Sequence, residues 1–489
     1  MNANVASLVY EQALLRPSSV AIITHQKTIT YAQLSRLVSI LARHLRSQEV
    51  EPGQVVGVSM AQIPLHLMTL LALAQVGAVS LPLHQAVSME RRLLAAKRFG
   101  ASCVVSGRNE FALEGLDFIG LDKVSFEAGM QEDDFIHPAS DDTPMRIAIS
   151  SGTSGDPKGM VLTHGLVELR NQTTEAGATS SSRVITMDIN FIVGFRPAMS
   201  ALARGAALVF PTSLGPDDLL DSMVKHQVTH AYFSPFQVRE IADRAVMNSI
   251  ACPDLVCLRV GGGHIREELL HSITTRLSQN VYASYGSTES GMVTYATPDM
   301  LMTYPNTVGK VCEWASVEVV DNENNLLPYG TTGQLRVRST HQVKSYYRDD
   351  ERSRSYFRNG WFYTGDLGHF DAEGLLYIDG RIDEQFNLGG MIIKPEDIEA
   401  TLAAHPAVID AGAFIAMEGG GYEIPAVALV LNDVTKMDEI QAYAREKLGP
   451  LAPVRYFTQL ALPRTVTGKL KRNELADLFS INELTSKIA

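Results

Sequence analysis

Apolar residues recur along the first 380 residues at two spacings, one helical and one strand-like. Helical spacing predicts helices over 31–47 and 65–75. Short apolar runs predict strands at 55–60 and 78–83. Because helix-like and strand-like segments keep alternating, the pattern predicts a largely parallel sheet covered by helices.

The pattern changes twice toward the C-terminus. From about Val308, short strands separated by turn residues predict a small β-rich lobe. Beyond 378–383, two amphipathic helices and two strands predict a compact α+β domain. The expected fold class is therefore α/β. A large N-terminal domain, 1–381, contains parallel-type sheets packed with helices plus the lobe, and a small C-terminal domain, 382–489, follows it.

Charge and apolar content narrow the class of protein. The chain has 42 basic and 54 acidic side chains, a formal net charge of −12, which opposes general nucleic-acid binding. The most apolar run, 65–83, is interrupted by His66, Gln75 and Pro82, so it predicts a buried helix and strand rather than a membrane span. The N-terminus shows no signal-peptide pattern, and the four cysteines have no CxxC spacing. We expect a cytoplasmic protein with reduced thiols, either a monomer or a homodimer.

The segment SSGTSGDPKG at 150–159 is too small and polar to fill a core. Its glycines permit an anion-binding nest of backbone N–H groups, and Lys158 adds a positive charge. The residues expected to hold phosphate oxygens are Ser150, Ser151, Gly152, Thr153, Ser154, Gly155 and Lys158. A strand before the segment and a helix over 161–172 after it predict a phosphate site at a helix N-terminus. Pro157 before the lysine and Gly159 after it depart from the common nucleoside-triphosphate loop, and a flexible surface loop is the alternative.

This segment resembles the phosphate loop of the adenylate-forming superfamily, which includes acyl-CoA synthetases, peptide-synthetase adenylation domains and firefly luciferase. Other segments resemble further motifs of that superfamily in the same order. They are ITYAQL (29–34), LAQVGAVSLPL (73–83), YGSTES (285–290), YTGDLG (363–368), GRIDEQFNLGGMIIKPEDIE (380–399) and PRTVTGKLKRNEL (463–475). The motifs look most similar to those of free-standing acyl- and aryl-CoA ligases.

The resemblance implies a reaction in two halves. A carboxylate attacks the α-phosphorus of ATP to give acyl-AMP and pyrophosphate, and a thiol then attacks the acyl carbon and releases AMP. The implied cofactors are ATP, Mg²⁺ and coenzyme A, or the phosphopantetheine of a carrier protein. Because two anions meet in the first half, the site must supply cations and hydrogen-bond donors.

The resemblance also implies roles for residues of the YGSTES motif. Tyr285 stacks on adenine, Thr288 donates to the α-phosphate, and Glu289 holds Mg²⁺. Glycines that let the backbone approach the nucleotide are Gly262, Gly263 and Gly286.

The later motifs are expected to hold the ribose and to switch the protein from the first half-reaction to the second. Asp366 accepts from the ribose hydroxyls, Arg381 reaches the ribose or phosphate, and the catalytic Lys469 bridges the substrate carboxylate and the α-phosphate. Asp383 is the expected hinge of a mobile C-terminal domain, and Asn387 stands where the family commonly has a lysine. The glycines expected to approach the pantetheine arm are Gly389 and Gly390.

The acid-binding region departs from amino-acid-activating relatives. Counting back from Gly205 places Ile192 where those relatives have an aspartate, so an α-amino acid is not expected as substrate. Many CoA ligases carry a histidine nearby, where this chain has Asn190 and Phe191. The expected pocket residues are Phe191, Ile192, Arg196, Phe233 and His264, which favour an apolar or aromatic acid. Two of these assignments stay open, because the arginine also suits a surface salt bridge and the histidine a backbone carbonyl.

The sequence therefore predicts an ATP-dependent acid–CoA ligase. The alternatives are a free-standing enzyme that loads a carrier protein, and an amide-forming relative. An inactive nucleotide-binding regulatory protein is the alternative from a different class, and it predicts the loss of Lys469 or Glu289, both of which are present.

Overall fold

The computed structural model forms two compact units. It describes residues 4–61, 63–122, 124–126, 136–151, 157–173, 177–247, 251–263, 265–382, 386–388, 391–418, 422–465 and 468–488. The first unit consists of 1–318, 336–364 and 371–377, and the second of 319–335, 365–370 and 378–489. The chain crosses between them within β16 (Ala315–Val320), β17 (Gly333–Ser339), β19 (Trp361–Phe370) and β20 (Leu376–Arg381).

The first unit contains a six-stranded sheet of order β6-β5-β3-β4-β7-β8. Its strands are β3 (Val55–Val58), β4 (Val79–Pro82), β5 (Cys103–Ser106), β6 (Asp117–Gly120), β7 (Pro144–Ser151) and β8 (Pro157–Thr163). All neighbours are parallel except β7 and β8, which are antiparallel. Short apolar strands of this kind, buried on both faces, are typical of parallel sheets with helical cover.

The larger sheet has the order β2-β1-β10-β9-β11-β12-β13-β14-β15-β20-β19-β17-β16, and its strands from β2 to β15 belong to the first unit. Those strands are β1 (Val20–Thr24), β2 (Thr28–Thr30), β9 (Arg183–Ile185), β10 (Ala207–Phe210), β11 (His230–Phe233), β12 (Cys257–Gly261), β13 (Val281–Ser287), β14 (Gly291–Ala296) and β15 (Thr307–Val311). The strands from β1 through β13 in this order are parallel, and β14 and β15 continue antiparallel. The carboxyl ends of parallel strands in both sheets are therefore available to position a site.

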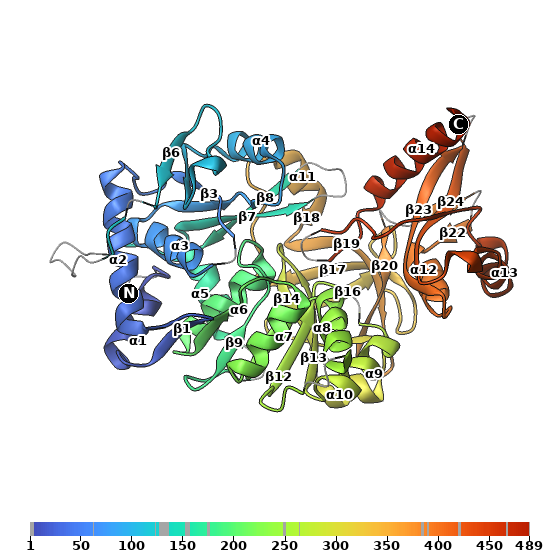
Figure 1. The fold of residues 1–489 in the computed structure, drawn as a ribbon, viewed down its shortest axis with the longest axis horizontal. Coiled ribbons are helices and arrows are strands. Elements are labelled where there is room, and N and C mark those ends of the chain that lie inside the picture. Colours follow the sequence, from blue (N-terminus) through green and yellow to red (C-terminus); the bar gives the residue numbers. More distant parts are fainter. Residues whose placement is uncertain are drawn as a thin grey trace. The chain divides into compact units, whose positions relative to one another are not determined.

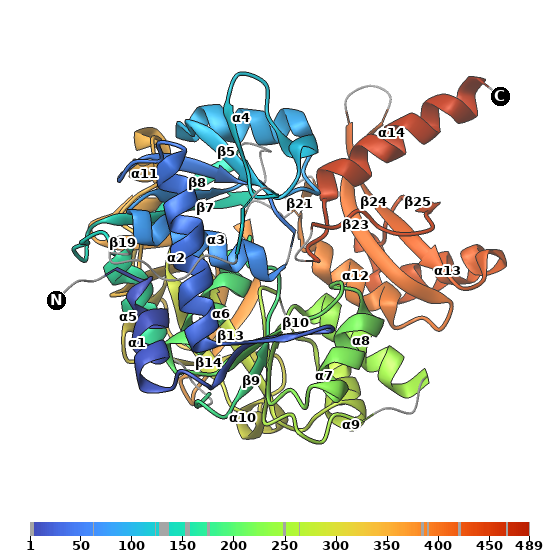
Figure 2. The same ribbon diagram turned by 60° about the vertical axis from the view of Figure 1, so that its left-hand side comes forward.

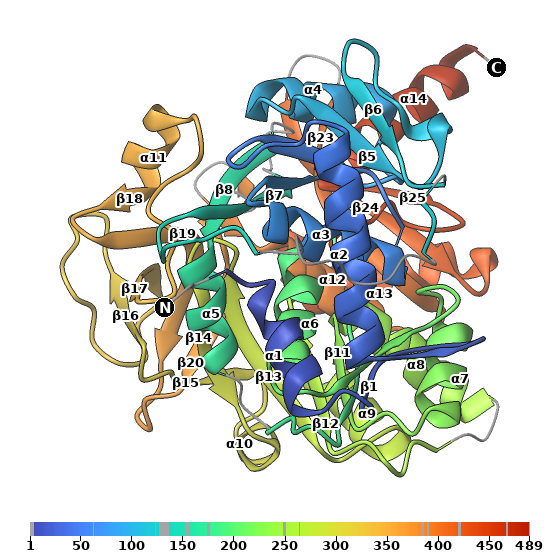
Figure 3. The same cartoon turned by 90° about the vertical axis from the view of Figure 1, so that its left-hand side faces the viewer.

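Helices cover these sheets in three groups (Figures 1 and 3). One core holds residues of α1 (Ser7–Leu15), α2 (Tyr31–Ser47), α3 (Pro64–Val76) and α6 (Ile192–Ala203) together with both sheets. A second core packs α7 (Pro216–Lys225), α8 (Pro235–Met247) and α9 (Glu267–Arg276) on the larger sheet, and a third packs α4 (Met89–Phe99) on the six-stranded sheet. The remaining elements are α5 (His164–Gln172), α10 (Pro298–Thr303), α11 (Asp350–Tyr356) and β18 (Phe357–Arg358).

The second unit is built on a small sheet of order β23-β24-β25, seen in orange and red in Figure 2. Its elements are β21 (Phe386–Leu388), β22 (Met391–Ile393), α12 (Pro395–Ala403), β23 (Val408–Glu418), β24 (Tyr422–Leu431), α13 (Met437–Leu448), β25 (Arg455–Thr458) and α14 (Arg472–Ile488). Two apolar clusters border this sheet, one with α12 and α13 and the other with α14. The expected fold class, a large α/β part followed by a small α+β part, is confirmed.

Two further findings concern membrane-spanning helices and the cysteines. No helix in the described ranges combines the length and the apolar character that a bilayer crossing requires. The cysteines are all buried and free, as expected from their spacing: Cys103, Cys252, Cys257 and Cys312.

Candidate active site

The glycine-rich segment lies in a β-hairpin, which corrects the predicted strand–loop–helix arrangement. β7 and β8 pair with Ser150 opposite Lys158, and the helix begins only at His164. The prediction of a continuous helix over 161–172 is wrong, because its first residues alternate, with Leu162 buried beside half-buried neighbours, and Thr163 then caps α5. The five residues between the strands, 152–156, lie outside the described residues, so the expected contacts of Gly152, Thr153, Ser154 and Gly155 stay predictions.

Lys158 of this hairpin lies over two aromatic rings of the first unit. Its Nζ is 4.9 Å from the ring centre of Tyr356 and 5.8 Å from that of Tyr346. The next residue, Gly159, accepts a hydrogen bond from the Tyr347 N–H at 2.7 Å, and a Cβ there would lie 2.5 Å from the Phe99 ring. The close approach requires a glycine, so the hairpin is fixed against 346–347 and the ammonium group is held on a cation–π surface.

Thr288 and Glu289 lie in the turn between β13 and β14. Residues from distant parts of the chain hold them in place. Arg170 of α5 is 3% exposed and donates from Nη2 to the Thr288 carbonyl at 3.1 Å. The Tyr346 hydroxyl donates to Glu289 Oε1 at 2.9 Å. Burial, together with the charge of Glu289, raises the pKa of Tyr346, so the hydroxyl keeps its proton and remains a donor.

The carboxylate of Glu289 fits a magnesium ion that is shared with phosphate. The side chain is 8% exposed, and Oε1 accepts one hydrogen bond, whereas Oε2 accepts none within the described part of the chain and is not fully buried. The described residues contain no cluster of three metal-ligating side chains. Mg²⁺ is commonly held in this way, by one or two carboxylates together with phosphate oxygens and water.

The residues expected around adenine follow neighbouring parallel strands. β12 and β13 pair with Gly261 opposite Ser284, so Gly262 and Tyr285 are the next residues along adjacent strands. Gly262 has a φ of +79°, and no atom lies within 4 Å of the position that a Cβ would take, which leaves its backbone open to a flat ligand. Gly263 is exposed as well, and His264 lies outside the described residues. Gly286 is required by packing, since a Cβ there would lie 2.1 Å from the Gly291 carbonyl oxygen.

The second unit brings Asp366 and Arg381 together across β19 and β20. Arg381 Nη1 donates to Asp366 Oδ1 at 2.8 Å, and the two side chains are 32% and 15% exposed, arginine first. Gly365, with a φ of +78°, precedes the aspartate and lies under the guanidinium group. A carboxylate fixed by an ion pair in this way is suited to accept hydrogen bonds from a ribose.

Lys469 lies on an exposed loop of the second unit that is held at its base. Its backbone N–H donates to Thr465 Oγ1 at 3.0 Å, and the Thr465 N–H donates to its carbonyl at 2.7 Å. Arg464 donates to the Gly468 carbonyl at 3.0 Å and to both Asp410 oxygens at 2.8 and 2.7 Å. The expected hinge and pantetheine residues, Asp383, Gly389 and Gly390, lie outside the described residues, and Asn387 lies in β21.

The expected acid-binding residues occupy different environments. Phe191 caps α6 and Ile192 is its first residue, and both are half-buried. Arg196 donates from Nη2 to the Thr173 carbonyl at 3.1 Å, so part of its guanidinium group is engaged within the protein. Phe233 is 0% exposed in the core that α7, α8 and α9 share with the larger sheet.

The chain belongs to the family of AMP-binding enzymes. The family model matches residues 9–347, and the model of the AMP-binding enzyme C-terminal domain matches residues 397–469. The resemblance drawn from the motifs is thereby confirmed.

Two relatives of this chain are CoA ligases. A 2-succinylbenzoate–CoA ligase of Bacillus velezensis is 27% identical over 479 residues, which cover 96% of this chain and 97% of the relative. An indoleacetate–CoA ligase of Aromatoleum aromaticum is 27% identical over 495 residues, covering 95% and 96%. The solved structure of the o-succinylbenzoate CoA synthetase of Bacillus subtilis, in complex with its acyl-adenylate intermediate, has a TM-score of 0.85 at 24% identity and covers 96% of this chain and 97% of that one. Its likeness shows that the fold is shared.

Proposed function

We propose that this protein is an acid–CoA ligase that activates an apolar or aromatic carboxylic acid as acyl-AMP and transfers the acyl group to coenzyme A. The observation that carries the proposal is that two charged groups from separate motifs converge on one side chain. Lys158 lies 5.8 Å from the ring centre of Tyr346, whose hydroxyl donates to Glu289 at 2.9 Å. A cation and a metal-ligating carboxylate placed together in this way suit a nucleotide triphosphate bound with Mg²⁺.

The first half-reaction assigns one role to each of several motif residues. Lys158 and the N–H groups of its hairpin bind the β- and γ-phosphates, and Thr288 donates to the α-phosphate. Glu289 holds Mg²⁺, which when bound neutralises charge on the phosphates. The substrate carboxylate forms its bond to the α-phosphorus as the bond to pyrophosphate breaks, and Lys469 balances the charge of the two anions.

The second half-reaction needs a thiol in place of pyrophosphate. The thiol loses its proton to solvent, its sulfur forms a bond to the acyl carbon, and the bond between that carbon and the AMP oxygen breaks, so AMP leaves with the oxygen that came from the acid. In this proposal residues 1–381 bind ATP and the acid, and residues 382–489 form the mobile domain that carries Lys469 and turns about Asp383. Asp366 and Arg381, joined by a 2.8 Å hydrogen bond, hold the ribose through both halves.

Coenzyme A is favoured as the acceptor because the two relatives described above are CoA ligases, and their alignments with this chain cover almost their whole length. The test is to incubate the protein with ATP, Mg²⁺, a panel of aromatic acids and coenzyme A, and to identify the products by mass. Acyl-CoA and AMP in equal amounts are expected. Acid-dependent pyrophosphate formation without a CoA adduct, followed by acylation of a pantetheinylated carrier protein or of an amine, would instead establish one of the two alternative acceptors.

A further inference from the structure

The backbone that leads into α6 is held rigidly from the six-stranded sheet. Arg146 of β7 is 0% exposed and donates from Nη2 to the carbonyls of Ile189 and Asn190 at 3.0 and 2.7 Å. The Asn190 amide donates to the Met60 carbonyl at 3.1 Å. These bonds to Arg146 in β7 and to Met60, two residues after β3, fix the backbone directly before Phe191, so this ring is presented from a stable support.

His84, which follows β4, lies against the same segment with both ring nitrogens engaged. The Ala86 N–H donates to Nδ1 at 3.0 Å, so Nδ1 carries no hydrogen, and the hydrogen of the neutral ring is on Nε2. This N–H donates to Asp188 Oδ2 at 2.9 Å. Asp188 Oδ1 in turn accepts from the backbone and side-chain amides of Asn190 at 2.8 and 2.9 Å. Because the polar atoms are satisfied inside the protein, His84 has only its ring surface to offer a ligand.

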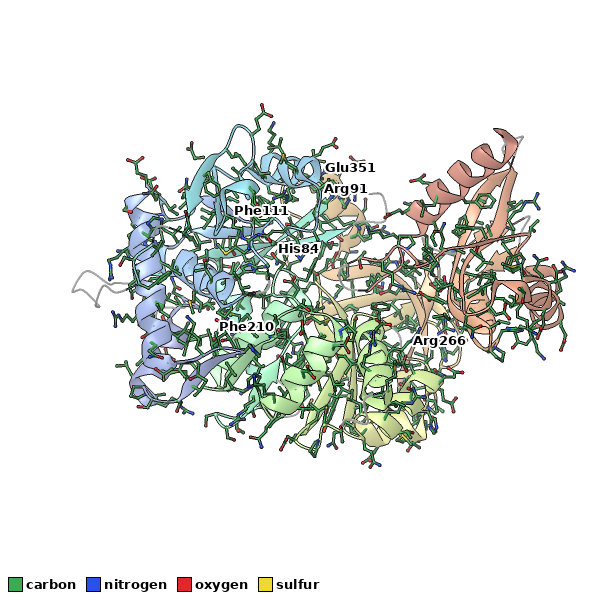
Figure 4. All side chains as sticks on the ribbon, in the orientation of Figure 1. His84, Arg91, Phe111, Phe210, Arg266 and Glu351 are labelled. Carbon is green, nitrogen blue, oxygen red and sulfur yellow. The ribbon has the colours of Figure 1, made fainter. Side chains whose placement is uncertain are left out.

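The ring surfaces of His84 and Phe191 adjoin one another. Their centroids are 5.4 Å apart, and the ring planes are tilted by 36°. The His84 side chain keeps 14% of its surface exposed, and Phe191 is half-buried. Figure 4 labels His84 in the middle of the first unit. Two partly accessible rings, each oriented by its own element, form a continuous aromatic surface.

This surface lies where the acid is expected. His84 comes two residues after β4, and Phe191 follows β9, so both rings come after the carboxyl ends of parallel strands, where ligands of α/β sheets bind. The histidine that many CoA ligases carry near Phe191 is missing from that segment of the sequence. His84 instead brings an imidazole beside Phe191 from a different part of the chain.

We propose, resting on the acid–CoA ligase function above, that His84 and Phe191 form an aromatic wall that selects acids with a planar aromatic acyl group, and that Asp188 orients the His84 ring. A planar ring stacks on this wall, whereas a flexible chain of the same size makes fewer simultaneous contacts. Removing one ring should therefore lower the preference for the aromatic acid about 2- to 13-fold.

The experiment measures acid-dependent ATP–pyrophosphate exchange with 3-phenylpropanoate and with octanoate, comparing the unmodified protein with His84→Ala, His84→Gln and Phe191→Leu. The ratio of kcat/KM for the aromatic acid to that for the aliphatic acid is expected to fall about 2- to 13-fold through KM for the aromatic acid, with KM for ATP unchanged. His84→Gln keeps a donor for Asp188, so the same fall in this variant assigns the effect to the ring rather than to lost folding. His271→Ala, an exposed histidine of α9, is the matched control.

The double variant His84→Ala/Phe191→Leu should lose less than the product of the two single effects, because both act through one surface. An unchanged ratio in the His84 variants, an equal fall for both acids, or a preference of the unmodified protein for octanoate would overturn this inference and leave the ligase function intact. Absence of exchange with every acid would remove the ligase function and the inference together.

Discussion

Replacement of Tyr346 by Phe removes a single hydroxyl from the centre of the candidate active site. This hydroxyl donates to Glu289 Oε1 at 2.9 Å, and Glu289 is 8% exposed. The aromatic ring remains, so Lys158 keeps its position over the ring face. The substitution therefore tests the orientation of the carboxylate separately from the placement of the ammonium group.

The expected size of the effect follows from the charge of Glu289 and from the burial of its hydrogen bond with Tyr346. A hydrogen bond to a charged group contributes about 1.5–3 kcal/mol, so the free energy of unfolding should fall by about 2 kcal/mol. Without its donor, the Glu289 carboxylate loses its fixed orientation toward the metal. Loss of a hydrogen bond that orients a metal ligand typically costs about 10–100-fold in metal affinity or activity.

The assay follows ATP–pyrophosphate exchange over a range of free Mg²⁺ concentrations, with binding of Mg²⁺·ATP measured separately by calorimetry. We expect the apparent Mg²⁺ constant of Tyr346→Phe to rise about 10–100-fold, with KM for the acid unchanged. Tyr347→Phe is the control, since the Tyr347 hydroxyl makes no hydrogen bond to the described residues. Unchanged Mg²⁺ dependence together with unchanged stability in Tyr346→Phe would refute the role given to this hydroxyl.

Three further predictions concern other parts of the chain. Lys469→Ala should abolish acyl-AMP formation yet leave thiol transfer from supplied acyl-AMP much less affected, with Lys471→Ala as control, and equal loss in both half-reaction assays would contradict the division of roles. Asp410→Asn should weaken the brace of Arg464 on the Lys469 loop, lowering the adenylation rate about tenfold or less with thiol transfer kept, whereas an equal effect on both halves would mean a general loss of structure. Burial lowers the pKa of His164 from 6.5 to about 4. Between these two pH values the unfolded chain binds protons more readily than the folded chain, so the free energy of unfolding should fall by about 2 kcal/mol from pH 6.5 to pH 5. Urea unfolding of His164→Gln should lose this component, and an identical pH profile would show that burial of this ring does not set it.

Local signals in the sequence predicted many elements closely. The helix at 31–47 has the predicted bounds because Thr30 and Gln33 form a reciprocal capping box and its apolar residues keep to one face. The strand-like stretches of the β-rich lobe, including 333–339 and 361–370, also form strands. In each case the determining interactions lie within a few residues of one another, which is why a single sequence reveals them.

The error at 161–172 has the opposite origin. Val161 and Leu162 suit either a helix or a strand. They form a strand because they pair antiparallel with β7. The pairing of Ser150 with Lys158 places the hairpin, so the phosphate segment is followed by a strand and not directly by a helix N-terminus. Short apolar runs are ambiguous in this way until their tertiary partners are known.

The residues of the candidate site also differ in whether local sequence signals could predict them. The motif residues Thr288, Glu289 and Lys158 could be named from sequence because their types and order are distinctive. The residues that orient them, Tyr346 and Arg170, could not, because their hydrogen bonds span 57 and 118 positions and leave no periodic signal. The same holds for the contact of His84 with Asp188, which joins residues 104 positions apart.

The most direct test of the account is to follow oxygen from the acid. If the acid attacks the α-phosphorus, a substrate labelled with ¹⁸O in both carboxylate oxygens passes one of them to AMP when the thiol attacks the acyl carbon. Mass spectrometry of AMP after turnover with coenzyme A should therefore find one ¹⁸O in each molecule of AMP formed. Acyl-CoA accompanied by unlabelled AMP, or by ADP and phosphate, would contradict the acyl-AMP pathway.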